Sequence, residues 1–169
     1  SAPHADSPLD VSAFKLVESS ADETHFIYAS VGVSSGNPYA FSFYAKAGER
    51  DWVVLRTTAT SSGSNAYISF DLSDGTTKRE SVLFDDFGTV AMADGWYRCW
   101  ATTTSGVTGS KLFGIYINND GDNQSSAYQG VLGNGIYIAF SQEELGAYPT
   151  SFAYSIAGGE GSTTTRIAD

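Results

Sequence analysis

The chain has 169 residues, which suits one domain with a sizeable hydrophobic core. Its formal net charge of −10, from 9 basic and 19 acidic side chains, argues against nucleic-acid binding, which depends on Lys and Arg to neutralise phosphates. The same charge argues against an anionic membrane surface, and no apolar run is long enough for membrane insertion.

The pattern along the chain predicts strands joined by short turns. Residues 1–10 are polar, contain Pro3 and Pro8, and are expected to be a lead-in or linker to one domain over residues 11–169. Strands are predicted over residues 14–18, 24–33, 39–47, 52–58, 66–72, 81–84, 96–103, 111–118 and 135–142. In residues 24–33, Phe26 and Tyr28 share a face. No segment has a sustained helical period, so almost no helix is expected.

Eight or nine short strands, the ninth being residues 81–84, with turn residues between them predict an all-β fold, a two-sheet antiparallel jelly-roll sandwich. Jelly-roll strand order would place the strands of Trp52, Tyr67 and Tyr116 in one sheet. The single cysteine, Cys99, has no partner for an internal disulfide and is expected to be a buried thiol. The predicted inward residues are Phe41, Phe43, Val53, Leu55, Ile68, Phe70, Tyr97, Cys99, Ile115 and Ile117.

Four stretches carry a resemblance to a known family: residues 39–49, the run Asp94-Gly95-Trp96-Tyr97-Arg98-Cys99, residues 135–146, and a tail made of residues 149–152 and 165–169. In them the chain resembles the concanavalin-A-like or carbohydrate-binding jelly-roll domains of bacteriophage tail and spike proteins and of polysaccharide-degrading enzymes. The resemblance covers residues 14–169, and it departs from the usual pattern at Glu143 and Ile167, where Leu and Ala are usual. It implies an extracellular domain that belongs to a larger multidomain or virion protein.

Aromatic side chains that alternate away from the core are the candidate ligand-binding residues. Sugars are held by aromatic faces together with planar polar groups that reach their hydroxyls. The candidates for carbohydrate binding are Trp52, Arg56, Tyr67, Tyr116, Trp100 and Tyr44. Each of these aromatics has a second interpretation, in which it covers a small second core or a sheet edge.

Catalysis is not expected. Glycoside hydrolysis needs two carboxylates across a cleft, whereas Glu143 and Glu144 are adjacent and point to opposite faces of a strand, as do Asp85 and Asp86. A structural calcium ion is the one cofactor considered. Asp120 and Asp122, with the neighbouring asparagines, supply hard oxygen donors around Gly121, although a solvated turn is the favoured interpretation.

The sequence therefore predicts a non-catalytic module that recognises a polysaccharide or cell-surface glycan through an aromatic-lined concave sheet face. The alternative is a structural or assembly domain of a phage tail or spike protein, in which the same aromatics contact other protein subunits.

Overall fold

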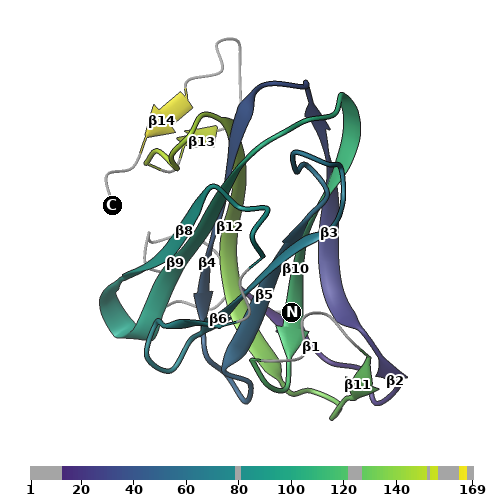
Figure 1. Ribbon diagram of the computed structural model, residues 1–169. Coiled ribbons are helices and arrows are strands. Elements are labelled where there is room, and N and C mark those ends of the chain that lie inside the picture. The colour runs from purple at the N-terminus through teal and green to yellow at the C-terminus, as the bar shows by residue number, and fades with distance from the viewer. Residues whose placement is uncertain (1–12, 79–80, 122–126, 152, 156–163, 167–169) are drawn as a thin grey trace.

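The computed structural model describes residues 13–78, 81–121, 127–151, 153–155 and 164–166. Two five-stranded antiparallel sheets pack face to face (Figure 1), which confirms the predicted two-sheet antiparallel sandwich. The helical content of the described residues is a single 3-10 turn, η1 (Ala93–Gly95).

The first sheet has the order β1-β12-β4-β9-β8. Its strands are β1 (Phe14–Val17), β12 (Gly135–Leu145), β4 (Pro38–Lys46), β9 (Trp96–Thr104) and β8 (Asp86–Ala91). The second sheet has the order β3-β10-β5-β6-β7, with β3 (His25–Val33), β10 (Gly109–Asn118), β5 (Trp52–Thr57), β6 (Ala66–Asp71) and β7 (Thr77–Lys78). Two small sheets pair β2 (Asp22–Glu23) with β11 (Tyr128–Gln129), and β13 (Ala153–Ser155) with β14 (Thr164–Arg166).

The main core lies between the two large sheets and follows the period-two alternation. Phe41 and Phe43 of β4 are 0% and 1% exposed, and the Phe43 ring meets Phe70 of β6 edge to face, with 6.2 Å between ring centroids. Nine of the ten predicted inward residues are buried in this core, and the tenth, Tyr97, is partly buried and packs against it. Cys99 is buried as predicted, and this burial raises the pKa of its thiol.

The solvent side of the first sheet, here the β4 face, carries a second small core. Tyr44 and Trp96 are 1% and 2% exposed there, and Phe140 meets Tyr44 edge to face at 6.3 Å. Phe140 is the extra residue at a bulge in β12, between Ala139 and Ser141, and its φ of 43° turns its side chain onto this face. Arg98 donates to Ser42 Oγ at 3.2 Å and to the Thr150 carbonyl.

One end of the sandwich is held by a buried carboxylate, Glu18. Its oxygens accept hydrogen bonds from Arg50 Nε at 2.5 Å, from the Tyr128 hydroxyl at 2.5 Å and from the Val131 amide at 2.8 Å. Burial alone would raise the pKa of Glu18, but the bonds from Arg50, Tyr128 and Val131 together outweigh burial and lower the pKa to about 2. The ionised Glu18 side chain therefore joins three loops, the one before β2, the one between β4 and β5, and the one after β11.

Two predictions about the strands were wrong or incomplete. Residues 81–84 form turns and not a strand: the Phe84 amide donates to the Ser81 carbonyl at 3.2 Å, while Val82 is 97% exposed. The edge strand β8, which pairs with β9, was not predicted. The predicted lead-in, residues 1–10, lies outside the described residues.

Candidate functional site

Four of the six predicted binding residues lie on the solvent side of the second sheet, here the β5 face. Trp52 and Arg56 of β5 alternate with the core residues Val53 and Leu55. The antiparallel register places Arg56 opposite Tyr67 of β6 on one side and opposite Gly114 of β10 on the other. Tyr116 follows Gly114 on the same face of β10. The prediction that the strands of Trp52, Tyr67 and Tyr116 share a sheet is confirmed.

Arg56 is the centre of this group. Its guanidinium lies over the Tyr67 ring, 5.5 Å from the ring centroid, and 5.7 Å from that of Tyr116. Nη1 donates to the Tyr116 hydroxyl at 2.7 Å, while Nε and Nη2 donate to Asn65 Oδ1 at 3.3 and 3.0 Å. The guanidinium is thus fixed in position by side chains from the neighbouring strands and from the turn before β6.

Two residues of β3 add further rings to the group around Arg56. Phe26 stacks on Tyr116, with 4.7 Å between centroids and 15° between planes, and Tyr28 lies 5.9 Å from Phe26. We call the resulting series of flat side chains the planar row. It runs across four adjacent strands and consists of Tyr28, Phe26, Tyr116, Arg56 and Tyr67. Tyr28 is 66% exposed and Phe26 is 40% exposed, whereas Tyr116, between Phe26 and Arg56, is 2% exposed. Tyr67, at the other end, is partly exposed, so the accessible rings lie near the two ends of the row.

Phe26 and Tyr28 were not among the predicted binding residues. Alternation placed them on one face of their strand, but it did not show which side of the sandwich that face would meet. Tyr28 pairs with Gly114 and Phe26 pairs with Tyr116, which places both side chains on the β5 face. A register that depends on residues more than 80 positions apart in the chain is not visible in a local pattern.

Gly114 makes room for the planar row within β10. A Cβ atom placed on Gly114 would lie 2.8 Å from Cε2 of Tyr116 and 3.3 Å from Cδ2 of Leu112. The Tyr116 ring therefore leans over the glycine, toward Arg56, which pairs with Gly114. Glycine in this central strand is explained by close packing on the β5 face.

Trp52 is also on the β5 face, but its ring is largely covered. A Cβ placed on Gly121 would lie 2.6 Å from Trp52 Cη2 and 2.7 Å from Lys78 Cδ, and Lys78 Nζ lies 5.7 Å from the Trp52 ring centroid. The segment after β10 thus folds against the indole. Trp52 supports one side of the face, while the more exposed rings belong to β3.

The remaining two predicted residues lie on the opposite side of the molecule. Tyr44 and Trp100 project from β4 and β9 onto the β4 face, so the main core separates them from Arg56. Tyr44 is buried in the second small core. Trp100 is partly exposed and lies over Gly88 of β8, where a Cβ would come within 3.2 Å of its ring. These two residues do not share a site with the planar row.

The calcium prediction depends on the segment after β10. Asp122 lies outside the described residues, and the exposed Asp120 stands just before Gly121, against which Lys78 packs. The Asn118 side-chain oxygen accepts from the Asn119 amide at 2.9 Å. Over the part of the chain that the structure describes, no group of three or more His, Cys, Asp or Glu side chains is placed to hold a metal ion. Calcium binding therefore stays a prediction.

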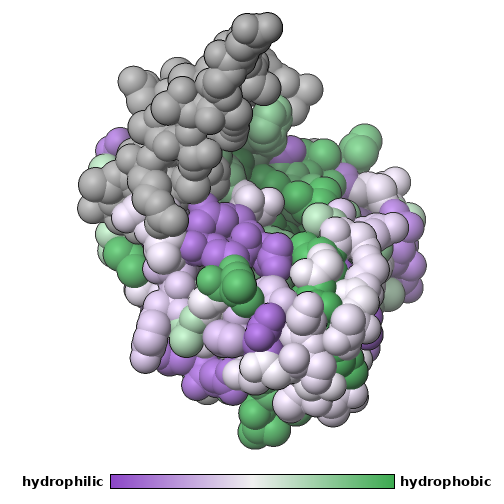
Figure 2. Space-filling model, turned by 90° about the horizontal axis from the view of Figure 1, so that it is seen from above, coloured by the Kyte–Doolittle hydropathy of each residue, from purple (hydrophilic) through white to green (hydrophobic). Residues whose placement is uncertain are grey.

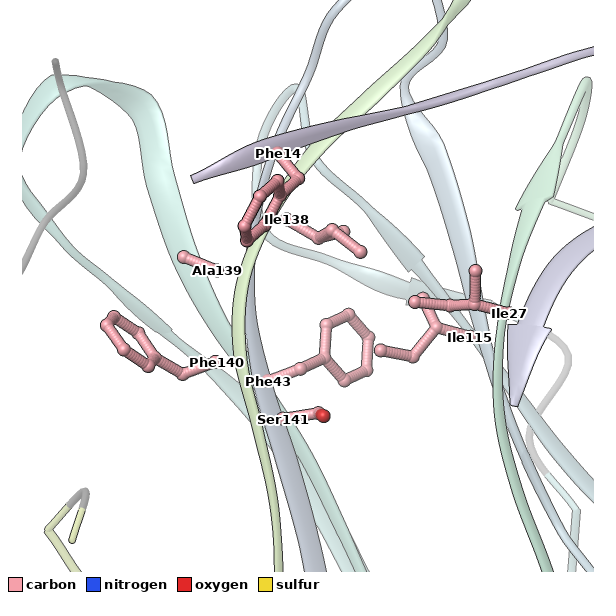
Figure 3. A pocket seen from close by; sticks show the side chains of 8 residues that line it. All are labelled: Phe14, Ile27, Phe43, Ile115, Ile138, Ala139, Phe140 and Ser141. Carbon is pink, nitrogen blue, oxygen red and sulfur yellow. The ribbon is translucent and has the colours of Figure 1, made fainter. Parts of the chain in front are cut away.

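An apolar cavity of about 220 Å³ opens at the edge of the sandwich, where β1 and β12 of one sheet face β3 and β10 of the other. Phe43 and Ile115 point toward each other from the two sheets, with Ile27 beside Ile115 (Figure 3). At the rim, Phe14 is 52% exposed and Ile27 is 41% exposed. Seen from above, hydrophobic residues also reach the surface in a hollow of the molecule (Figure 2).

Comparison with known proteins adds no functional assignment. The sequence matches no protein-family model and no curated protein. Within the described residues, no helix is long and apolar enough to cross a membrane. The site must therefore be interpreted from its own geometry.

Proposed function

We propose that this protein is a non-catalytic carbohydrate-binding module that recognises a polysaccharide or cell-surface glycan with its β5 face. The observation that carries the proposal is the planar row across four strands, with Tyr28 66% and Phe26 40% exposed at one end. Exposed aromatic rings that gather on one face of a soluble domain are typical of a binding site. At the other end of the row, Arg56 and Asn65 supply the planar polar groups that bond sugar hydroxyls.

The planar row is suited to a chain ligand and not to a single sugar. It crosses four neighbouring strands, which lie about 4.8 Å apart, so it spans roughly 14 Å. Tyr28 and Tyr67, on the first and last of these strands, thus present rings to separate sugar units of one extended chain. Because the face is open and offers few buried contacts, affinity for each site is expected to be modest.

A modest affinity per site is useful when several copies act together. Linking binding modules raises the effective concentration of the second binding event, so that avidity exceeds single-site affinity. The resemblance to phage tail and spike domains and to modules of polysaccharide-degrading enzymes supports such a setting. We infer that the domain acts extracellularly, as part of a larger secreted or virion protein.

Affinity electrophoresis of the chain against neutral and acidic polysaccharides, with and without calcium chelator, tests the proposal. Retardation by at least one polymer class is expected. If chelator abolishes the retardation, calcium belongs to the site, and if it does not, calcium is unnecessary for binding. Migration unchanged by every polymer, with and without calcium, would contradict carbohydrate binding.

A second candidate function, a structural or assembly domain that binds other protein subunits, is favoured by one observation. The apolar cavity has a rim formed by the exposed Phe14 and Ile27. Apolar side chains exposed together at a sheet edge suit a protein interface better than a sugar. Size-exclusion chromatography separates the two candidates, because a stable trimer would favour assembly and a monomer would favour the binding module.

A further inference from the structure

We propose that the ligand of the β5 face is an acidic polysaccharide, a polyuronate, and that Arg56 binds the carboxylate of one uronate unit. The inference rests on the proposed carbohydrate-binding function and adds the chemical class of the ligand. It is motivated by how the guanidinium of Arg56 is held and by which groups surround it.

Two N–H groups of the Arg56 guanidinium remain available to a carboxylate ligand after its hydrogen bonds within the protein are counted. Its hydrogen bonds to Asn65 and Tyr116 use three of the five guanidinium N–H groups, one on each nitrogen. One N–H on Nη1 and one on Nη2 are then left for a ligand. Two N–H groups on the terminal nitrogens of one guanidinium match the two oxygens of a carboxylate.

The described contacts of Arg56, which are Asn65, Tyr67 and Tyr116, are all neutral, so none of them balances its charge. Other cations of the chain are paired differently: Arg50 Nε lies 2.5 Å from Glu18, and Lys15 Nζ lies 2.6 Å from Glu49. A guanidinium that is fixed in place without a carboxylate partner is a receptor for an anion.

The surrounding positions of the β5 face favour the same ligand. Along β3, β10, β5 and β6, all of which the structure describes, the outward positions carry one cation, Arg56, and one carboxylate, Asp71. Asp71 stands opposite Trp52 and accepts hydrogen bonds from the Ser73 amide at 2.9 Å and hydroxyl at 2.6 Å. It is two outward positions from Tyr67, so the aromatic end of the face around Arg56 is locally basic.

A uronate unit also lies beside the Tyr67 ring. This ring is partly exposed and lies against one side of the guanidinium, so a sugar bonded to Nη1 and Nη2 is next to it. Because Asn65 and Tyr116 already fix the guanidinium, little side-chain entropy is lost when the carboxylate binds.

The negative net charge of the protein separates specific binding of an acidic polymer from general electrostatic attraction. A chain with a formal net charge of −10 repels polyanions overall, so general electrostatic attraction does not produce retention by an acidic polymer. Retention of a polyuronate requires a local site that overcomes this repulsion.

The test is affinity electrophoresis of the full chain in polygalacturonate, in the same polymer with its carboxyl groups methyl-esterified, and in neutral xylan and dextran. Retardation by polygalacturonate that esterification abolishes is the expected result. In the acidic polymer, the Arg56→Gln variant should raise the dissociation constant about tenfold, and Arg56→Lys should fall between that variant and the wild type. The esterified polymer probes the wild-type chain, so the test holds even if a variant does not fold.

Three outcomes would overturn the inference in distinguishable ways. Equal retardation by polygalacturonate and its methyl ester, or retardation by neutral polymers alone, would leave carbohydrate binding intact and reject the uronate. Retardation by polygalacturonate that Arg56→Gln leaves unchanged, with the variant folded by circular dichroism, would reject Arg56 as the receptor. Retardation by none of these polymers, nor by a wider polysaccharide panel, would reject the proposed function as well.

Discussion

Arg56 Nη1 donates a hydrogen bond of 2.7 Å to the hydroxyl of Tyr116, a residue 60 positions further along the chain. The bond links β5 to β10 on the solvent side of their sheet. Tyr116 is 2% exposed, so its hydroxyl serves the protein and not the ligand directly. It positions the guanidinium, while the Tyr116 ring supports Phe26.

This bond predicts the effect of Tyr116→Phe. The variant keeps the ring that stacks on Phe26 but removes the oxygen that accepts from Arg56. We expect a loss of about 1 kcal/mol in the free energy of unfolding, measured by urea denaturation, since one part-buried hydrogen bond is removed. Tyr28→Phe, at a 66% exposed position, is the control and should change stability by less than about 0.5 kcal/mol. Equal stability of both variants would show that the bond to Arg56 contributes nothing.

Glu18→Gln should cost about 3 kcal/mol in the free energy of unfolding at pH 7, because it leaves Arg50 without its charged partner. The pKa of Glu18 is about 2 in the folded protein, below its ordinary value of 4.5. A lowered folded pKa means that the ionised carboxylate stabilises the fold above pH 4.5 and that this contribution is lost between about pH 4.5 and 2.

The measurement is urea denaturation of the wild type and Glu18→Gln at several pH values from 7 to below the folded pKa of about 2. The difference in stability between them should shrink over the acidic window. Glu23→Gln, at an exposed position, is the matched control and should follow the wild type throughout. A constant difference between wild type and Glu18→Gln across this range would contradict the assignment.

Glu143 gives the opposite pH dependence. It pairs with Phe41 in the register of β12 and β4 and points toward the interior, where burial raises the pKa of its carboxyl. A raised folded pKa means that stability is greatest when the carboxyl is protonated and falls as the pH rises through the folded pKa. Glu143→Gln should therefore be more stable than the wild type at pH 7, with the gain disappearing in acid. An unchanged or lower midpoint of urea denaturation at pH 7 would contradict this.

Cys99 should be inert in the folded protein. It is 0% exposed between the sheets, and burial raises the pKa of its thiol, so little reactive thiolate is available. A thiol reagent such as a disulfide-exchange dye should label it slowly in buffer and rapidly in concentrated urea. Fast labelling without denaturant would show that the core at β9 opens readily.

The alternation of residues predicted most of the fold, because a strand with one buried face constrains every second side chain. Phe41, Phe43, Val53 and Leu55 were all placed inward correctly. The errors occur where this constraint is weak. The run Val82-Leu83-Phe84 is apolar but lies in a turn, while β8 is an edge strand whose residues are only partly buried or exposed.

The candidate site was predicted only in part, since alternation gives the face of a strand but not what covers that face. Tyr44 and Tyr67 both alternate away from the main core, yet Tyr44 is buried in a second small core and Tyr67 remains partly exposed beside Arg56. Phe26 and Tyr28 join the site only through pairing with a strand more than 80 residues away.

The central claim is that the β5 face binds a glycan, and the most direct test compares two exposed tyrosines. Tyr28 lies in the planar row and is 66% exposed, while Tyr148 follows β12 of the other sheet and is 69% exposed. Affinity electrophoresis of Tyr28→Ala and Tyr148→Ala should be run in a polysaccharide that retards the wild type. We predict that Tyr28→Ala weakens binding about tenfold and that Tyr148→Ala migrates as the wild type does. Equal retardation of both variants and the wild type would contradict binding at this face.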